Sequence, residues 1–172
     1  TLLARKKESM GICFLEGQDY REFILQQIPQ FAENSGNIVD LSGAIIGRHK
    51  GLLNYTIGQK RDMPVRNGFP LYVARIDVAS NTIVAAEKSE LFSHTLWLEH
   101  LRFHRESDLY ADKMEIKVRG LGLNPPGYIR VQKESEHLWK INLAAPAWAV
   151  APGQPAALYC GERLIGGGII SR

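Results

Sequence analysis

The chain has 172 residues, of which 45% are hydrophobic and 23% charged, and it carries a formal net charge of +3. These proportions are those of one globular domain or two small ones, and the slight excess of positive charge is compatible with a polyanionic partner without identifying one. No stretch approaches the roughly 20 apolar residues of a membrane helix, and the amino terminus lacks the apolar centre of a signal peptide, so we expect a cytoplasmic protein with no membrane partner.

Cysteine and histidine usage argues against a metal site or a disulfide framework. The two cysteines, Cys13 and Cys160, have no second thiol or histidine pair nearby, and the five histidines form no ligand pattern. Cys160 lies in an alternating strand-like stretch and is interpreted as a packed residue. Cys13 follows three cations at residues 5–7, and nearby positive charge lowers the pKa of a thiol. Cys13 is therefore a candidate for chemistry, although a free cysteine more often serves packing.

The first part of the chain predicts a short helix and a hairpin. Residues 19–27 place apolar side chains at helical spacing, and Asp19 is suited to cap the first turn. Residues 37–40 and 44–47 flank the connection Leu41-Ser42-Gly43, which is typical of a β-hairpin.

The rest of the chain predicts strands separated by turns. In residues 113–119, Met114, Ile116 and Val118 alternate with charged residues, so one face of the strand is buried and the other is basic. Further strands are expected at residues 71–78, 82–86, 128–133, 138–143, 155–160 and 164–170.

This spacing of strands indicates a fold class that is mainly β. We expect a small α+β module in residues 1–68, followed by a carboxy-terminal antiparallel β-barrel in residues 69–172.

Two glycine-bearing segments have a structural interpretation as well as a functional one. His49 lies between Gly47 and Gly51, which favours a tight turn around a structural histidine over a catalytic one. The glycines at residues 166–168 lie inside a strand pattern, where close backbone packing is the more common role. Neither a GxGxxG turn nor a GxxxxGK[ST] loop occurs, so no ATP site is expected within this chain.

Five sequence blocks occur in order along nearly the whole chain: Ser9-Met10-Gly11-Ile12-Cys13-Phe14, Gly47-x-His49-x-Gly51-Leu52, Tyr55-Thr56-Ile57-Gly58-Gln59, Ala151-Pro152-Gly153-Gln154 and Gly-Gly-Gly-Ile-Ile at residues 166–170. Together they resemble the signatures of tRNA-specific 2-thiouridylases. The resemblance implies an ATP-pyrophosphatase domain, then a small central domain, then a β-barrel similar to the second domain of elongation factors. Because the chain has no starting Met and opens on motif-like sequence, we expect a fragment that covers the last two domains.

The resemblance also implies the chemistry. Members of this family use ATP, with Mg, to adenylate the C2 oxygen of the wobble uridine of tRNA and then replace that oxygen with sulfur. Cys13 matches the cysteine that receives sulfur as a persulfide from a sulfur-carrier protein or a cysteine desulfurase. A persulfide's outer sulfur is a good nucleophile toward an activated carbon. The ATP site and a second cysteine belong to the expected missing domain, so the fragment alone is expected to be inactive.

Three residues of the barrel match positions that contact tRNA in the family: Arg119, Gly120 and Gln154. Gly120 stands where an aromatic residue is frequent, and Lys60-Arg61-Asp62-Met63 replaces the more usual Arg-Lys-Gly-Leu. Two other functions stay open: an RNA-binding barrel without covalent chemistry, in which Cys13 is only packed, and a domain that docks a sulfur carrier.

Overall fold

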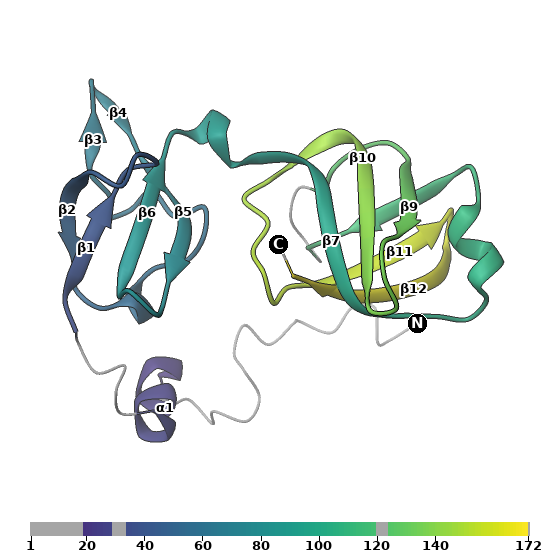
Figure 1. The fold of residues 1–172 in the computed structure, drawn as a ribbon, viewed down its shortest axis with the longest axis horizontal. Helices are drawn as coiled ribbons and strands as arrows, with labels where there is room; N and C mark the ends of the chain where they lie inside the picture. The colour runs from purple at the N-terminus through teal and green to yellow at the C-terminus, as the bar shows by residue number, and fades with distance from the viewer. Residues whose placement is uncertain (1–18, 29–33, 120–123, 172) are drawn as a thin grey trace, which may run out of the picture.

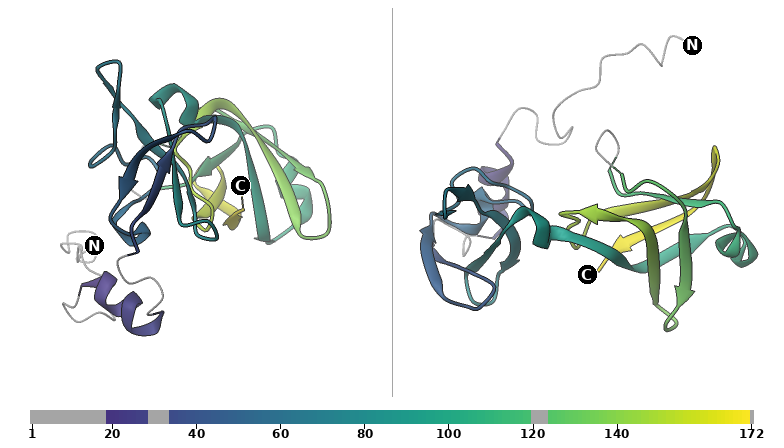
Figure 2. Two further views of the ribbon diagram at one scale, coloured as in Figure 1. Left: turned by 60° about the vertical axis from the view of Figure 1, so that its left-hand side comes forward. Right: turned by 90° about the horizontal axis from the view of Figure 1, so that it is seen from above.

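The computed structural model describes residues 19–28, 34–119 and 124–171, and it consists mainly of β-strands, as the sequence predicts. A four-stranded sheet and a six-stranded barrel lie side by side and are joined by the chain around η5 (Lys88–Leu91) (Figures 1 and 2). Among the described residues, no helix is both long and apolar enough to cross a membrane.

The helix α1 (Tyr20–Gln27) forms as predicted at the start of the described chain. Asp19 is its N-cap, and the carboxylate of Asp19 accepts a hydrogen bond from the backbone N–H of Arg21 at 2.7 Å. This bond satisfies one of the backbone donors that a helix start leaves unpaired.

The first sheet has the strand order β2-β1-β6-β5. The strands β1 (Gly36–Val39) and β2 (Ile45–His49) form the predicted hairpin, and β5 (Tyr72–Asp77) and β6 (Thr82–Ala86) form a second antiparallel pair. The central pairing, between β1 and β6, is parallel. Short elements between β2 and β5 are η4 (Leu52–Asn54), β3 (Val65–Arg66) and β4 (Phe69–Pro70).

The first sheet includes two strands beyond the expected boundary at residue 68, β5 and β6. That boundary would place β5 and β6 in the barrel, whereas hydrogen bonds join them to β1 and β2 in one sheet. Ile38 of β1 and Ile83 of β6 are buried in the same core cluster with Val73 of β5. The first sheet therefore ends at Ala86. A strand parallel to β1 needs a crossover connection, so it comes later in the chain and is not adjacent to β1, and the local sequence pattern does not reveal this pairing.

The barrel has the strand order β8-β11-β12-β7-β10-β9, with every neighbouring pair antiparallel. Its elements are β7 (Phe92–Phe103), η6 (Glu106–Tyr110), β8 (Met114–Lys117), β9 (Ile129–Lys133), β10 (Leu138–Trp148), β11 (Pro155–Cys160) and β12 (Arg163–Ile170). In the described residues the two edge strands, β8 and β9, pair only with β11 and β10. The barrel is therefore open between them.

The barrel core confirms the alternation of residues 113–119. Met114, Ile116 and Val118 are buried, while Glu115 and Lys117 are exposed. The glycines of β12 also have the expected role, because a Cβ atom on Gly167 would lie 2.8 Å from the carbonyl oxygen of Ala156 in β11. Small residues let β12 lie closely between its two neighbours.

Three features of the strands were not predicted. The strand β7 is the longest in the structure and pairs with both β12 and β10, yet it was not recognised in the sequence. The strand β10 continues to Trp148, beyond the expected end at residue 143, through an irregularity in its pairing with β7. A bulge between Val73 and Arg75 interrupts the alternation of β5, in which Val73 is fully buried.

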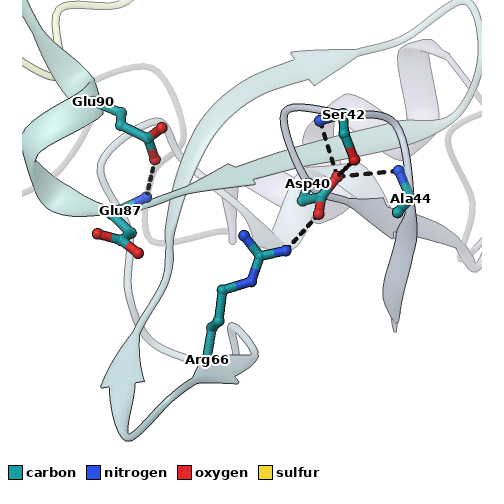
Figure 3. Close-up of polar contacts among 6 residues, drawn as sticks. All are labelled: Asp40, Ser42, Ala44, Arg66, Glu87 and Glu90. Carbon is teal, nitrogen blue, oxygen red and sulfur yellow. Dashed lines mark hydrogen bonds and ion pairs between the residues drawn. The ribbon is translucent and has the colours of Figure 1, made fainter.

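Two groups of polar contacts stabilise the turns of the first sheet (Figure 3). Asp40 follows β1, and its carboxylate accepts hydrogen bonds from the backbone N–H groups of Ser42 and Ala44 at 2.9 and 3.1 Å and pairs with Arg66 of β3. After β6, Glu87 and Glu90 form a capping box at the start of η5, with the backbone N–H of Glu87 donating to Glu90 at 2.8 Å.

Candidate functional site

Two of the four sequence-predicted site residues lie in the described part of the chain, and both hold the connection between β10 and β11. Arg119 follows β8, and Gln154 lies just before β11. Cys13 and Gly120 lie outside the described residues. The structure therefore brings Arg119 and Gln154 to one segment, residues 148–154.

Arg119 braces the start of that segment. Its Nη2 donates hydrogen bonds to the carbonyl oxygens of Trp148 at 2.9 Å and Ala149 at 2.8 Å. Ala149 has a φ of 48°, a left-handed conformation that is unusual for a residue other than glycine. The backbone N–H of Ala149 donates to Leu91 at 2.9 Å. A charged donor on two carbonyls helps to keep this strained corner in place.

The side chain of Asn124 fixes the backbone around Arg119. Its Oδ1 accepts from the N–H groups of Val118 and Arg119 at 2.7 and 3.0 Å, and its Nδ2 donates to the carbonyl of Arg119 at 2.8 Å. Asn124 therefore holds the end of β8 in a fixed position and, with it, the start of the Arg119 side chain.

Gln154 closes the other end of the segment. Its Oε1 accepts a hydrogen bond from the backbone N–H of Ala151 at 3.1 Å. The backbone of the same turn bonds to β12, with Gly153 donating to Ile170 at 2.7 Å and Ile170 donating to Gln154 at 2.9 Å. Within the described chain the Nε2 of Gln154 has no hydrogen-bond acceptor, so this amide is able to donate to a ligand.

The same segment packs against the first sheet. Tyr72 of β5 and Trp148 make an edge-to-face contact with ring centroids 5.9 Å apart. Gly58 has a φ of 85°, and a Cβ atom there would lie 2.9 Å from the Cβ of Ala149. The Gly58 position is therefore restricted to glycine both by its backbone conformation and by contact with the barrel.

A cavity of about 570 Å³ lies at this junction between sheet and barrel. Its lining includes three aromatic rings and three cations: Tyr72, Phe92, Trp148, Lys60, Lys88 and Arg119. Phe92 is 45% exposed, and the buried Nε1 of Trp148 has no hydrogen-bond partner among the described residues. Aromatic faces beside cations are suited to stacking an unpaired base and holding its phosphate.

The other candidate residues have structural roles. His49 is 1% exposed; its Nδ1 accepts from the backbone N–H of Gly51 at 3.1 Å, and its Nε2 therefore donates to the carbonyl of Asn81 at 3.0 Å. Cys160 is half-buried at the end of β11 against the barrel core. In the part of the chain that the structure describes, no three His, Cys, Asp or Glu residues are grouped to hold a metal ion.

Comparison with known sequences gives two matches that divide the chain as its sheets do. Residues 21–87 match the family described as the tRNA methyl transferase PRC-barrel domain, and residues 93–170 match the family described as the aminomethyltransferase beta-barrel domain. The tRNA-specific 2-thiouridylase MnmA of Rickettsia typhi is 33% identical over 170 residues, which are 99% of this chain and 47% of that protein. The enzyme of the same name from Rickettsia felis is 32% identical over 99% of this chain and 46% of its own length.

The chain belongs to the tRNA-specific 2-thiouridylase family. The resemblance seen in the five sequence blocks is thereby confirmed. The chain spans about half the length of the curated relatives that it matches. The interval between the two matched regions, residues 88–92, contains η5 (Lys88–Leu91), which lies between the first sheet and the barrel.

Sequence reasoning missed most of the junction cavity. Lys88, Phe92 and Trp148 lie in no recognised block. Phe92 and Trp148 meet through the pairing of β7 with β10, and the first sheet adds Tyr72 and Lys60 to the cavity only by packing on the barrel. Gly58 was the available signal, since it lies in the block of residues 55–59, two residues before Lys60. Glycine at such a position marks close approach of another segment.

Proposed function

We propose that this chain is the part of a tRNA-specific 2-thiouridylase that carries the sulfur-relay cysteine, Cys13, and a tRNA-contacting barrel. The observation that carries the proposal is the identity of 33% with a relative named for this activity, maintained over 99% of the chain. The cationic, aromatic-lined junction cavity supports it, because such a surface suits single-stranded RNA.

Cys13 acts as the sulfur donor in this proposal. The terminal sulfur of its persulfide forms a bond to C2 of the wobble uridine, and the adenylated oxygen leaves as AMP with the electron pair of the C–O bond. A second thiol of the protein then attacks the Cys13 sulfur. The S–S bond of the persulfide breaks and its electron pair goes to the sulfur on C2. A disulfide forms between the two cysteines. ATP, bound with Mg outside this chain, supplies the activation of the oxygen.

The barrel holds the tRNA beside this chemistry. Arg119 presents positive charge at the junction cavity, and Gln154 presents its amide from the neighbouring turn. Gly120 directly follows Arg119 in the chain and would permit close approach of the RNA backbone. The same chain meets a sulfur-carrier protein or a cysteine desulfurase, which delivers sulfur to Cys13 in the cytoplasm.

The test of this function is sulfur transfer to the chain. We expect a cysteine desulfurase supplied with radiolabelled cysteine to label the unmodified chain, and Cys13→Ser to lose most of that label. Cys160→Ser is the matched control and should keep it, because Cys160 is half-buried in β11. Label that is lost from Cys160→Ser and retained by Cys13→Ser would contradict the proposed relay.

A further inference from the structure

A cavity of about 940 Å³ is formed by the first sheet and α1. Arg48 and Lys50 reach it from the end of β2, Arg21 from α1, and Arg61 from the turn before β3. The remaining lining residues are polar or aromatic: Ser35, Asn54, Tyr55, Gln59 and Asp62. We call this feature the cationic cavity.

The charge of the cationic cavity is only partly compensated. Arg61 pairs with Asp62 at 3.5 Å, and Arg21 pairs with Asp19 at 3.4 Å. Arg48 and Lys50 are both exposed, and neither has an ion pair within residues 19–28, 34–119 and 124–171. They flank the buried His49, so the two-residue period of a strand places both on the same side of β2. Two like charges held side by side, neither of them in an ion pair within the described residues, favour an anionic ligand.

The backbone that carries these cations is held in place by amide side chains. The Nδ2 of Asn54 donates to the carbonyl of Lys50 at 3.0 Å, and the Nε2 of Gln59 donates to the carbonyl of Arg61 at 2.9 Å. The buried ring of Tyr55 meets His49 edge to face, with centroids 5.9 Å apart. Binding to a surface that is already ordered avoids part of the entropy cost of association.

The cationic cavity and the junction cavity share one turn of the chain. Gly58 and Lys60 line the junction cavity, whereas Gln59 and Arg61 line the cationic cavity. Consecutive Cα atoms are about 3.8 Å apart, so the walls of the two cavities are separated by single residues along this turn. One extended polyanion is able to occupy both, while a small anion would reach only one.

We infer that the cationic cavity of the first sheet binds the phosphate backbone of the same RNA strand that occupies the junction cavity. This inference rests on the proposed function, which supplies tRNA as the ligand of the junction. It adds a second contact surface, on the domain expected to carry the sulfur relay. Arginine and lysine bind phosphate oxygens without reading bases, so the contact positions the RNA and contributes no sequence specificity.

The experiment compares tRNA binding by the whole chain and by the double variant Arg48→Ala/Lys50→Ala, titrated between about 50 and 200 mM salt. Both side chains are exposed, so the fold should be retained. We expect at least a tenfold loss of affinity at the lower salt and a log-log salt slope that is shallower by about one to two units. Arg102→Ala/Arg105→Ala is the matched control, since it removes two exposed cations from the barrel.

The outcomes separate the inference from the proposed function. If the unmodified chain binds no tRNA at either salt concentration, the proposed function fails. If Arg119→Ala weakens tRNA binding but Arg48→Ala/Lys50→Ala does not, the barrel contacts tRNA as proposed, and the cationic cavity is not part of the RNA-binding surface. If the Arg102→Ala/Arg105→Ala control loses as much affinity for tRNA as the cavity variant, the loss follows from the change in net charge alone, and the inference is overturned. It would also be overturned if the cavity variant lost binding to a sulfur-carrier protein while tRNA binding stayed intact.

Discussion

Asp40 and Arg66 form an ion pair that joins the end of β1 to the β3–β4 hairpin (Figure 3). The side chain of Asp40 is 10% exposed and that of Arg66 is 46% exposed. The hydrogen bond from the Ser42 hydroxyl, and then the one from Arg66, lower the pKa of Asp40 from 3.8 to about 2. Asp40 therefore fixes the β1–β2 turn on one side and the hairpin on the other only while it is ionised.

The first prediction concerns the pH dependence of folding. Because the pKa of Asp40 is lower in the folded chain than in the unfolded chain, its contribution to the free energy of unfolding is fully present above about pH 4 and is lost as the pH falls toward 2. We expect Asp40→Asn to lower the Tm at pH 6, and the difference from the unmodified chain to shrink between pH 4 and pH 2. Thermal melts across this range would measure it.

Ser42→Ala provides the matched variant for this prediction. The Ser42 hydroxyl lowers the pKa of Asp40 more than any other single group, so its loss should move the acid transition toward higher pH. An Asp40→Asn variant whose Tm differs from that of the unmodified chain by the same amount at pH 6 and pH 2 would contradict the assignment.

The sequence predicted those parts of the fold that depend on neighbouring residues. The cap at Asp19, the β1–β2 hairpin and the alternation of Met114, Ile116 and Val118 are local, and the structure confirms them. The membership of β5 and β6 in the first sheet depends on the parallel pairing of β1 with β6, which joins segments far apart in the chain. Period-two patterns do not encode that choice of partner.

The sequence named the candidate site residues but not the contacts that they make. Family resemblance pointed to Arg119 and Gln154. In the structure Arg119, which follows β8, bonds to the start of the β10–β11 connection, and Gln154 lies at its other end. Lys88 joins the site only through domain packing, which leaves no trace in local sequence.

The second prediction tests the barrel core. Ile116 of β8 is 2% exposed and Ile141 of β10 is 0% exposed, so each truncation to Ala removes buried apolar contacts and leaves a cavity. Either change should lower the free energy of unfolding by about 2–5 kcal/mol. Ile169→Ala is the control, because Ile169 is 39% exposed, and it should cost about 1 kcal/mol or less. Urea titrations would give all three values, and near-equal values would contradict the assigned faces.

The third prediction separates backbone strain from domain contact at Gly58. Gly58 and Gly43 have nearly the same φ, 85° and 86°, but a Cβ atom meets Ala149 at Gly58 and nothing within 4 Å at Gly43. Gly43→Ala should therefore cost about 1–3 kcal/mol for the left-handed conformation alone. Gly58→Ala should cost more in the same urea titration, and it should expose Trp148 to a fluorescence quencher. Equal costs with unchanged quenching would show that the barrel does not constrain Gly58.

The fourth prediction concerns the two roles of Arg119. Its guanidinium braces the carbonyls of Trp148 and Ala149, and in the proposed function its charge also contacts tRNA. Arg119→Ala should lower the free energy of unfolding by about 1–3 kcal/mol, because two carbonyls lose a charged donor. It should also weaken tRNA binding and flatten the log-log salt slope by somewhat under one unit.

Arg119→Lys distinguishes the two roles, because an ammonium keeps the charge but lacks the planar fork of donors. It should destabilise the chain as Arg119→Ala does while it retains most of the salt slope. Gln154→Ala should lower the affinity for tRNA with an unchanged slope, since the amide is neutral. These values come from calorimetric melts and from tRNA titrations at three or more salt concentrations. If Arg119→Ala and Arg119→Lys flatten the slope equally, the loss comes from displacement of the β10–β11 connection, and the charge of Arg119 makes no direct contact with the RNA.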